Sequence, residues 1–228
     1  MIDFAFFADT FRQLLGGMPL TLALTGIATV AGLILALVLA AMRLSSNRFF
    51  DWPARFYIFC FRGSPLLVQI FLIYYGLSQF PELRRSILWP YLRDPFWCAS
   101  LALSLNTAAY ASEVFRGGFL SVPKGMVEAA RACGMSRSLT FRHIIAPLAL
   151  RQALPAYGNE IILIVKASSL ASTVTLMEVT GIAAGIIAET YRPIEVFICA
   201  AAIYLTVNFI VTRAVQAAEY VITPERRS

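Results

Sequence analysis

The chain has 228 residues, of which 59% are hydrophobic and 14% are charged. A soluble domain carries about 25% charged residues, so this composition excludes an ordinary water-soluble surface and fits a lipid bilayer as solvent. The start of the chain has Asp3 and Asp9 in place of a basic cluster, and no small-residue cleavage site follows. We therefore expect no detachable signal peptide.

Five apolar segments are long enough to cross a membrane, which takes roughly 20 residues of helix. Four are uncharged runs, and the fifth contains Glu160 and Lys166. The sequence thus predicts an all-α integral membrane protein with a single transmembrane domain over residues 1–228. The predicted spans cover residues 16–42, 60–80, 95–115, 150–174 and 194–216. The run 179–188 is too short to span, and Gly181 and Gly185 weaken it as a helix, so we expect a short periplasmic or interfacial segment.

Basic residues are biased toward one side of this predicted topology. Thirteen of the 19 follow the first span, follow the third span or lie in the C-terminal tail. These are Arg43, Arg48, Arg55, Arg62, Arg116, Lys124, Arg131, Arg137, Arg142, Arg151, Arg213, Arg226 and Arg227. The other side has Arg12, Arg84, Arg85, Arg93 and Arg192. The bias predicts the N-terminus outside and the C-terminus in the cytoplasm. It also explains the net charge of +6 without nucleic acid.

The predicted cytoplasmic segment between the third and fourth spans is longer than topology requires. It begins with a Pro-containing helix start at 121–125, and a helix-compatible stretch follows over 126–133. Gly134 suits a helix C-cap, and a second basic helical stretch over 136–145 is expected to end at Pro147. Long loops without a span of their own are usually functional, so we expect residues 121–147 to dock a soluble partner.

The spacing within this loop carries a resemblance. Glu128-Ala129-Ala130 is followed after three residues by Gly134, and after nine more by Ile144 and then Pro147. This resembles the EAA loop of ABC importer permeases, with Ala146 where the family has Leu. The segments 61–69, 106–110, 113–123 and 154–160 extend the resemblance over nearly the whole chain. They resemble polar amino acid uptake permeases of the M type, which serve histidine, octopine and nopaline systems, and residues 74–81 favour the opine branch.

The resemblance implies a role for each loop residue and a set of partners. Glu128, Ala129, Ala130, Gly134, Ile144 and Pro147 would form a coupling helix and turn that seat in the ATPase subunit. The small alanines allow close backbone approach, and Gly134 permits the turn. The implied assembly has two ATP-binding subunits, a second permease subunit that is a copy or a paralogue, and a periplasmic solute-binding protein. It lies in the lipid of the bacterial inner membrane.

Ionisable residues inside a predicted span are functional hypotheses by default. Asn159 and Glu160 fall near the middle of the fourth span, where a carboxylate suits a cationic amino acid or opine; the alternative is a carboxyl that is protonated or paired within the protein. Lys166 lies on nearly the same stripe. It could attract a substrate carboxylate, pair with the partner permease or extend to the interface.

A polar stripe is also predicted on the third span. Asn106, Tyr110, Glu113 and Arg116 share one helix face. This stripe could line the translocation path or form a gate. Alternatively, Glu113 and Arg116 could simply form an ion pair at i and i+3.

The remaining chemistry argues against an enzyme. The four cysteines are scattered, and His143 is the single histidine, so we expect no metal site and no catalytic residue. The chain has no Gly-Lys-Ser/Thr phosphate-binding loop, so no cofactor is expected and ATP would bind the partner subunit. The prediction is a permease subunit of an ATP-driven importer. The alternatives are an intramembrane enzyme and a channel-like membrane protein.

Overall fold

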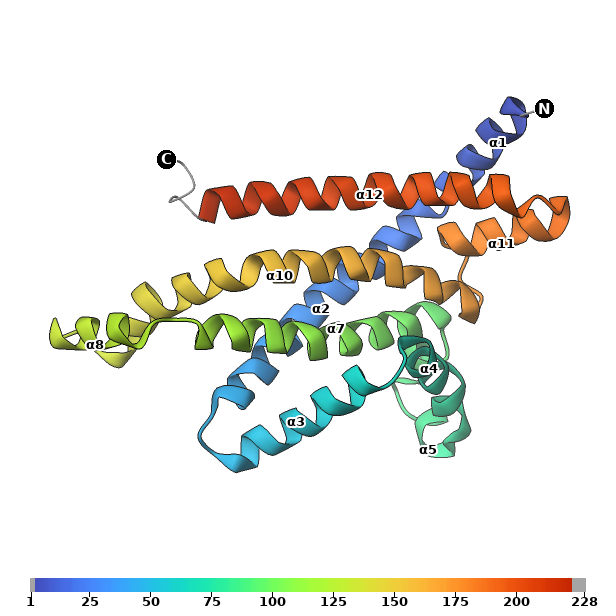
Figure 1. Cartoon of the computed structure of the whole chain (residues 1–228). Coiled ribbons are helices and arrows are strands. Elements are labelled where there is room, and N and C mark those ends of the chain that lie inside the picture. Colours follow the sequence, from blue (N-terminus) through green and yellow to red (C-terminus); the bar gives the residue numbers. More distant parts are fainter. Residues whose placement is uncertain (1–2, 223–228) are drawn as a thin grey trace.

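The computed structural model describes residues 3–222 and contains only helices and loops in that range (Figure 1). Arg226 and Arg227, which entered the charge count, lie outside the described residues. The longer helices are α1 (Phe4–Leu15), α2 (Met18–Leu44), α3 (Arg48–Gly63), α7 (Pro95–Leu120), α8 (Lys124–Ala132), α10 (Ala146–Ala167), α11 (Val179–Thr190) and α12 (Pro193–Ile222). The short ones are α4 (Leu66–Phe71), α5 (Pro81–Arg84), α6 (Trp89–Leu92) and α9 (Arg137–Thr140).

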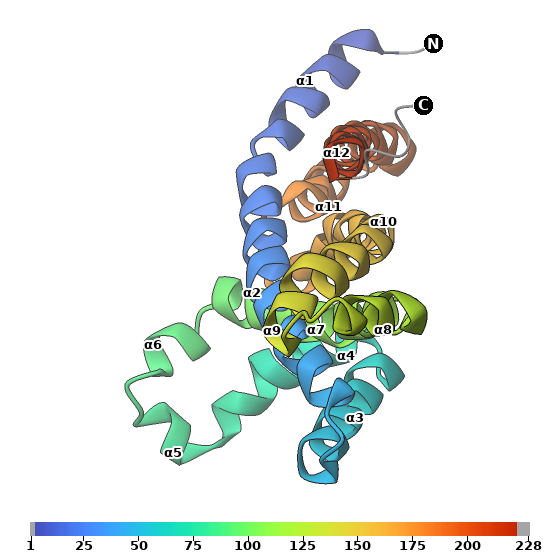
Figure 2. The same cartoon turned by 90° about the vertical axis from the view of Figure 1, so that its left-hand side faces the viewer.

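Four further short segments complete the description. Two are π-helical turns, η1 (Leu72–Gly76) and η3 (Phe141–Ile145), and two are 3-10 turns, η2 (Leu77–Gln79) and η4 (Ser168–Val174). Viewed end-on, α12, α10 and α7 are stacked in that order, and α3 lies beyond α7 (Figure 2). Helix α10 packs against both α7 and α12, so these three helices form the frame of the molecule.

The first predicted span corresponds to α2, but a preceding helix was not predicted. Helices α1 and α2 follow each other so closely that Phe4–Leu44 forms one stretch of 41 residues that could cross a membrane. Asp3 caps α1 by accepting a hydrogen bond from the Phe6 amide at 3.1 Å, and it pairs with Arg192 at 3.2 Å. The amide of Phe6 and then Arg192 hold the pKa of Asp3 below its usual value. These contacts attach the start of the chain to the segment before α12.

The second predicted span is wrong as a single helix over 60–80. Helix α3 already begins at Arg48, and the chain bends by 106° between α3 and the stretch Leu66–Gln79. Ser64 and Pro65 are extended at the bend, because proline fixes φ and disfavours the helical conformation of the residue before it. The result is an elbow, which we define as residues 62–69.

Helix α7 is the central helix of the fold. It packs against α2 along much of its length and also contacts α3, α4 and α10. Its buried positions are mostly alanine and serine, including Ser100, Ser104 and Ser112. Small side chains let neighbouring helices approach closely in a membrane protein. Because protein surrounds α7, it can be less hydropathic than a helix that faces lipid.

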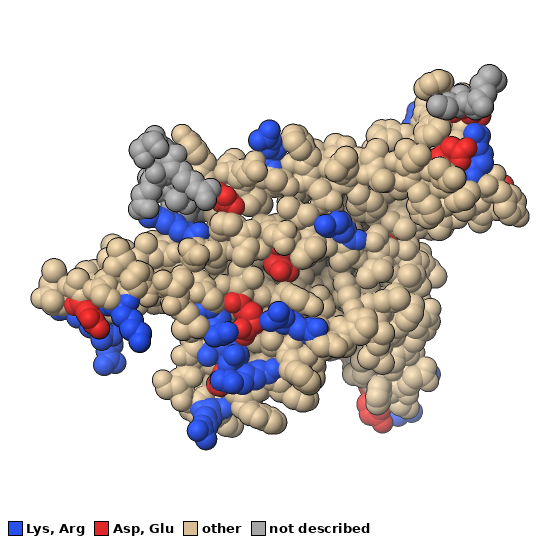
Figure 3. Space-filling model, viewed as in Figure 1, with Lys and Arg blue, Asp and Glu red and all other residues tan. Residues whose placement is uncertain are grey.

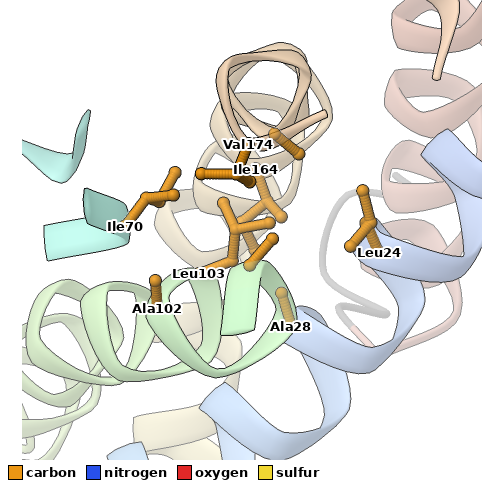
Figure 4. Close-up of a cluster of buried hydrophobic side chains, with 9 residues drawn as sticks. Leu24, Ala28, Ile70, Ala102, Leu103, Ile164 and Val174 are labelled. Carbon is orange, nitrogen blue, oxygen red and sulfur yellow. The ribbon is translucent and has the colours of Figure 1, made fainter. Parts of the chain in front are cut away.

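The largest apolar cluster joins α7 to parts of α2, α4, α10 and η4 (Figure 4). Leu24 and Ala28 come from α2, and Leu103 from α7. Ile70 of α4 and Ile164 of α10 close the cluster from the other side. Helix α4, which begins within the elbow, is therefore packed against α2, α7 and α10, and this packing holds the elbow in place.

The loop between α7 and α10 contains the two predicted helices, but the second does not end at Pro147. Helix α8 ends at Ala132, and Gly134 follows with φ of +78°, as its predicted capping role requires. Helix α9 continues through the π-turn η3 directly into α10, where Pro147 occupies the first turn. The Ala146 amide bonds to the Phe141 carbonyl five residues earlier. Proline is tolerated in a first turn, which explains the continuity.

The segment 179–188, which was expected to be a short periplasmic or interfacial segment weakened as a helix by two glycines, lies in the helix α11. Glu178 caps this helix with its side chain, accepting the Gly181 amide at 2.9 Å. Val179 and Ala183 are fully buried in a cluster with residues of α1 and α12. Capping and tertiary packing thus outweigh the low helix propensity of the two glycines. The stretch Arg137–Val174 meets α11 at a bend of 50°.

Two neighbouring glycines of α7 provide a direct stability test. A Cβ on Gly118 would lie 2.6 Å from the Ala149 carbonyl oxygen of α10, whereas a Cβ on Gly117 would meet no atom within 4 Å. We expect Gly118→Ala to lower the melting temperature of the purified complex, at a cost of about 1–3 kcal/mol. Gly117→Ala should leave it unchanged or raise it, by up to about 1 kcal/mol of helix propensity. Equal melting temperatures for the two variants would contradict close α7–α10 packing.

Candidate functional site

A pocket of about 470 Å³ opens where the elbow meets α7 and α10. Its polar and charged lining comes from all three elements. The lining residues that concern us are Arg62 and Ser64 of the elbow, Asn106, Thr107 and Tyr110 of α7, and Glu160 of α10. Of the predicted path residues, Asn106 and Glu160 are thus brought together, although 54 positions separate them in the sequence.

Amide side chains hold the elbow beside α7. The buried Gln69 donates hydrogen bonds to the carbonyl oxygens of Phe61 at 2.8 Å and Ser64 at 3.1 Å. Asn106 donates to the same Phe61 carbonyl at 3.2 Å and to the Gln69 side-chain oxygen at 3.0 Å. These bonds satisfy the backbone groups that the bend leaves without helical partners. Asn106 therefore fixes the shape of the pocket as well as lining it.

Arg62 lies in the pocket instead of the cytoplasmic segment in which it was counted from sequence. Helix α3 begins at Arg48, so Arg62 is carried roughly 20 Å along the helix from the α2–α3 turn. Its guanidinium lies over the Tyr110 ring, 5.0 Å from the centroid. The sequence analysis included Arg62 only within the segment 61–69 that carries the family resemblance, and gave it no place in a site because its position depends on the unpredicted elbow.

Glu113 and Arg116, the other two members of the predicted stripe, do not line this pocket. They form the ion pair that was the simpler prediction, at 2.7 Å. Glu113 also pairs with Arg43 of α2 at 3.2 Å, and Arg43 in turn pairs with Asp51 at the start of α3. Asp51 also binds Arg55 at 2.7 Å. This cluster joins α2, α3 and α7, and no local pattern in the sequence could predict the pairing of Glu113 with Arg43 on another helix.

Asn159 and Lys166 also lie outside the pocket lining. Asn159 is exposed, although it neighbours Glu160. Lys166 is exposed and lines a separate hollow of about 420 Å³ with Ser169, Thr180 and Tyr204. Adjacent residues of a helix point about 100° apart, so the pair Asn159–Glu160 cannot share one direction.

A buried carboxyl that the sequence analysis missed lies next to this second hollow. Glu178 is fully buried and accepts hydrogen bonds from the Tyr204 hydroxyl at 2.7 Å and the Thr21 hydroxyl at 3.4 Å. Together with the Gly181 amide it connects α2, α11 and α12. The sequence does contain a signal for Glu178, because an acidic residue directly before the apolar run 179–188 is a pattern typical of a helix N-cap.

The predicted docking loop forms a third concave surface. A hollow of about 530 Å³ contains four of the six predicted loop residues, namely Ala129, Ala130, Ile144 and Pro147. Glu128 and Gly134 are exposed on the same helix and turn. Lysine and arginine side chains gather beneath α8 and around the ion-pair cluster of α2, α3 and α7 (Figure 3). The loop thus combines the exposed carboxylate of Glu128 with a hollow lined by Ala129 and Ala130, and both lie on a surface rich in basic residues.

Fold and pocket together define a class of protein, a helical membrane subunit that passes a solute and does not itself carry a phosphate-binding loop. Residues 28–219 match the family of binding-protein-dependent transport system inner membrane components, and the chain belongs to this family. The resemblance seen in the loop spacing is confirmed. ATP hydrolysis in ABC transporters of this kind belongs to a separate chain, so this permease is not the enzyme.

Three relatives have named transport functions. The chain is 61% identical over 225 residues to the octopine transport system permease protein OccM of Rhizobium meliloti, across 99% of this chain and 92% of that protein. It is 51% identical to the nopaline permease NocM of Agrobacterium fabrum, across 100% and 95% of the two chains. It is 41% identical to the histidine/lysine/arginine/ornithine permease HisM of Escherichia coli K12, across 89% and 86%.

Two solved transporter structures are similar to this chain in fold. A chain of an amino acid ABC transporter crystallised with histidines superposes with a TM-score of 0.84 and 35% identity, covering 96% of this chain and 98% of that one. A chain of the inward-facing methionine transporter MetNI gives a TM-score of 0.76 at 16% identity, over 93% and 97%. The second comparison concerns the fold alone.

Proposed function

We propose that this chain is the permease subunit of an inner-membrane importer that moves a cationic amino acid or opine from periplasm to cytoplasm. The observation that carries the proposal is Glu160, a half-buried carboxylate at the midpoint of the helical stretch Ala146–Val174, in a pocket large enough for an amino acid. The relatives transport octopine, nopaline and basic amino acids, all of which carry a cationic or polar side group.

The proposed substrate site is restricted to the pocket, with Asn106 and Glu160 as its predicted members. Glu160 would attract the cationic group of the solute, and Asn106 would keep the elbow in place. Glu113 and Arg116 are engaged in ion pairs, so we assign them a structural role at the proposed cytoplasmic end. Asn159 and Lys166 are left out of the proposed site because they do not line the pocket.

The proposed topology has five spans: α2, the elbowed pair α3 and α4, α7, α10 with η4, and α12. Hydropathy and length support α12 and the stretch Phe4–Leu44, which contains α2, directly. The second span is supported as a bent pair, and the fourth is supported as the stretch Arg137–Val174 together with α11, from which it is bent by 50°. Helix α7 is long enough at 26 residues but more polar. Helix α8 and the end of α12 lie at one end of the molecule, and the N-terminus lies at the other (Figure 1). With the basic surface on the α8 side, this arrangement supports an external N-terminus and a cytoplasmic C-terminus.

The proposed coupling surface is α8 with the hollow beside it. An ATPase subunit would seat there, with Glu128 exposed for a basic partner and Ala129 and Ala130 allowing close approach. We propose an assembly of two ATPase subunits, a second permease subunit and a periplasmic binding protein. Closure of the ATPases would move α8, and the continuous path α9–η3–α10 would transmit that movement to Glu160.

Uptake by proteoliposomes containing the whole complex tests the proposed function. Labelled octopine should accumulate inside only when ATP and the loaded binding protein are both present. Octopine that merely equilibrates, with or without ATP, would instead support the channel-like alternative. The same assay with arginine, nopaline and histidine ranks the substrates.

A further inference from the structure

We propose that Glu178 is a positioning residue for transport, which anchors one end of the helical stretch α10–η4 while the ATPase subunits move the other end. Glu178 does not line the pocket that contains Glu160, so it is distinct from the proposed substrate site. The inference rests on the proposed function, since it takes α8 as the surface that receives the ATPase. It adds the fixed point that such a movement needs.

The first observation is that three helices meet at the Glu178 side chain. This side chain is fully buried. It accepts hydrogen bonds from the Gly181 amide of α11 at 2.9 Å, the Tyr204 hydroxyl of α12 at 2.7 Å and the Thr21 hydroxyl of α2 at 3.4 Å. The Tyr204 hydroxyl also lies 3.0 Å from the Thr180 hydroxyl of α11. Because a lost bond would leave a buried polar group unsatisfied, this cluster fixes the three helices relative to one another.

The backbone around Glu178 is packed as closely as its side chain. A Cβ on Gly17, directly before α2, would lie 2.6 Å from the Glu178 carbonyl carbon. A Cβ on Gly181 would lie 2.2 Å from the Leu176 carbonyl oxygen. Both glycines thus permit an approach that a larger residue would prevent. The segment around Glu178 therefore cannot shift along α2 without breaking these contacts.

The chain that connects α10 to Glu178 is also held in an unusual conformation. The 3-10 turn η4 has seven residues, although runs of more than three or four are uncommon. Ala171 and Val174 of this turn are fully buried in the apolar cluster with α2, α4 and α7. Thr175 follows with φ of +68°, a left-handed conformation that β-branched residues rarely adopt. Such a conformation persists where surrounding contacts impose it, and the contacts of Glu178 do so here.

The distance between this anchor and Glu160 gives the anchor a role in transport. Helix α10 runs from Ala146 directly into η4, with α8 near one end and α11 near the other (Figure 1). From the rise per residue, Thr175 lies about 25 Å from Glu160 and about 45 Å from Ala146 along this stretch. With the Thr175 end fixed, a sideways shift of the Ala146 end displaces Glu160 by about half as much. With that end free, the same shift has no defined effect on the pocket.

Tyr204→Phe tests the anchor with a small change. It removes the hydroxyl that donates to the Glu178 carboxyl and keeps the aromatic ring. Octopine uptake and ATP hydrolysis would be measured together in proteoliposomes that contain the whole complex, with loaded binding protein present. We expect the octopine transported per ATP to fall by about 2- to 10-fold, the factor that one hydrogen bond contributes to an equilibrium. Stimulation of ATP hydrolysis should persist, because α8 is unchanged.

Two further variants grade and control this result. Thr21→Val removes the longer hydrogen bond to Glu178, so it should lower the octopine transported per ATP by a smaller factor. Tyr191→Phe removes a hydroxyl from an exposed tyrosine directly after α11 and should keep the native ratio. If Tyr204→Phe does not assemble with its partner subunits, Thr21→Val against the native chain decides the question.

A distance measurement tests the anchor without changing it. Spin labels on exposed residues would report the distances from Leu22 of α2 to Thr173 of η4 and to Leu150 of α10. Serine would replace Cys60 and Cys133, the cysteines that are not buried. Addition of ATP to the complex should change the distance to Leu150 and leave the distance to Thr173 unchanged. Equal changes in both distances, or no change in either, would overturn the inference.

The uptake outcomes separate this inference from the proposed function. A native ratio of octopine to ATP in both Tyr204→Phe and Thr21→Val would overturn the anchor alone, even if the melting temperature fell, because a merely structural contact has that effect. An equal fall in uptake and hydrolysis would do the same. Failure of the native complex to accumulate octopine would instead overturn the proposed function, and the anchor with it.

Discussion

Glu128→Arg is expected to abolish the stimulation of ATP hydrolysis by solute-loaded binding protein. Glu128 is exposed on α8, next to the two alanines that line the hollow proposed to receive the ATPase. The arginine would face the basic residue of the ATPase subunit that is proposed to pair with Glu128. Like charges placed together at an interface cost several kcal/mol, so we expect stimulation to fall at least tenfold. The measurement is ATPase activity of the reconstituted complex with and without loaded binding protein.

A matched charge reversal elsewhere controls for nonspecific effects. Glu82→Arg changes an exposed acid on α5, at the end of the molecule away from α8, and should leave stimulation intact. Basal hydrolysis by the ATPase subunits should be similar in all three complexes if they assemble equally. Normal stimulation in Glu128→Arg would show that α8 is not the coupling surface.

Glu160→Gln is the second change with a large expected effect. Glutamine keeps the size of the side chain but removes the negative charge, so the cationic group of the solute loses its counter-charge. Truncating one partner of a charge pair in a partly buried site costs about 2–5 kcal/mol, from which we expect KM for transport to rise at least tenfold. The assay is initial uptake rate against the concentration of labelled octopine.

An exposed carboxyl provides the comparison for Glu160. Glu189→Gln removes a charge near the end of α11 and lies outside the pocket lining, so its KM should match that of the native chain. If Glu160→Gln transports octopine with the native KM, the substrate is held elsewhere, for example in the partner permease. Testing Asn159→Ala in the same series would show whether its neighbour also contributes.

The sequence predicted those features that depend on local pattern. Long apolar runs marked α2 and α12, and the EAA spacing marked α8 and the turn at Gly134. The prediction of Glu160 as a charge at mid-span followed from its position in an apolar run, and the structure places it in a pocket. Each of these features can be recognised from neighbouring residues alone.

Features set by contacts between distant residues could not be predicted in this way. The break at Pro65 lies inside an apolar run, so hydropathy gave a single span where the chain bends. Arg62 enters the pocket only because of that elbow. Helix α11 forms because Glu178 caps it and because α1 and α12 cover it, which outweighs the propensity of Gly181 and Gly185. The partners of Glu113 on α2 likewise depend on the fold.

The pocket itself is the central claim, and a structure of the whole complex with octopine bound tests it most directly. An electron cryomicroscopy map should show the guanidinium of octopine near Glu160 and the elbow close against Asn106. Density for octopine beside Lys166, or only within the partner permease, would contradict the assignment of this pocket as the substrate site.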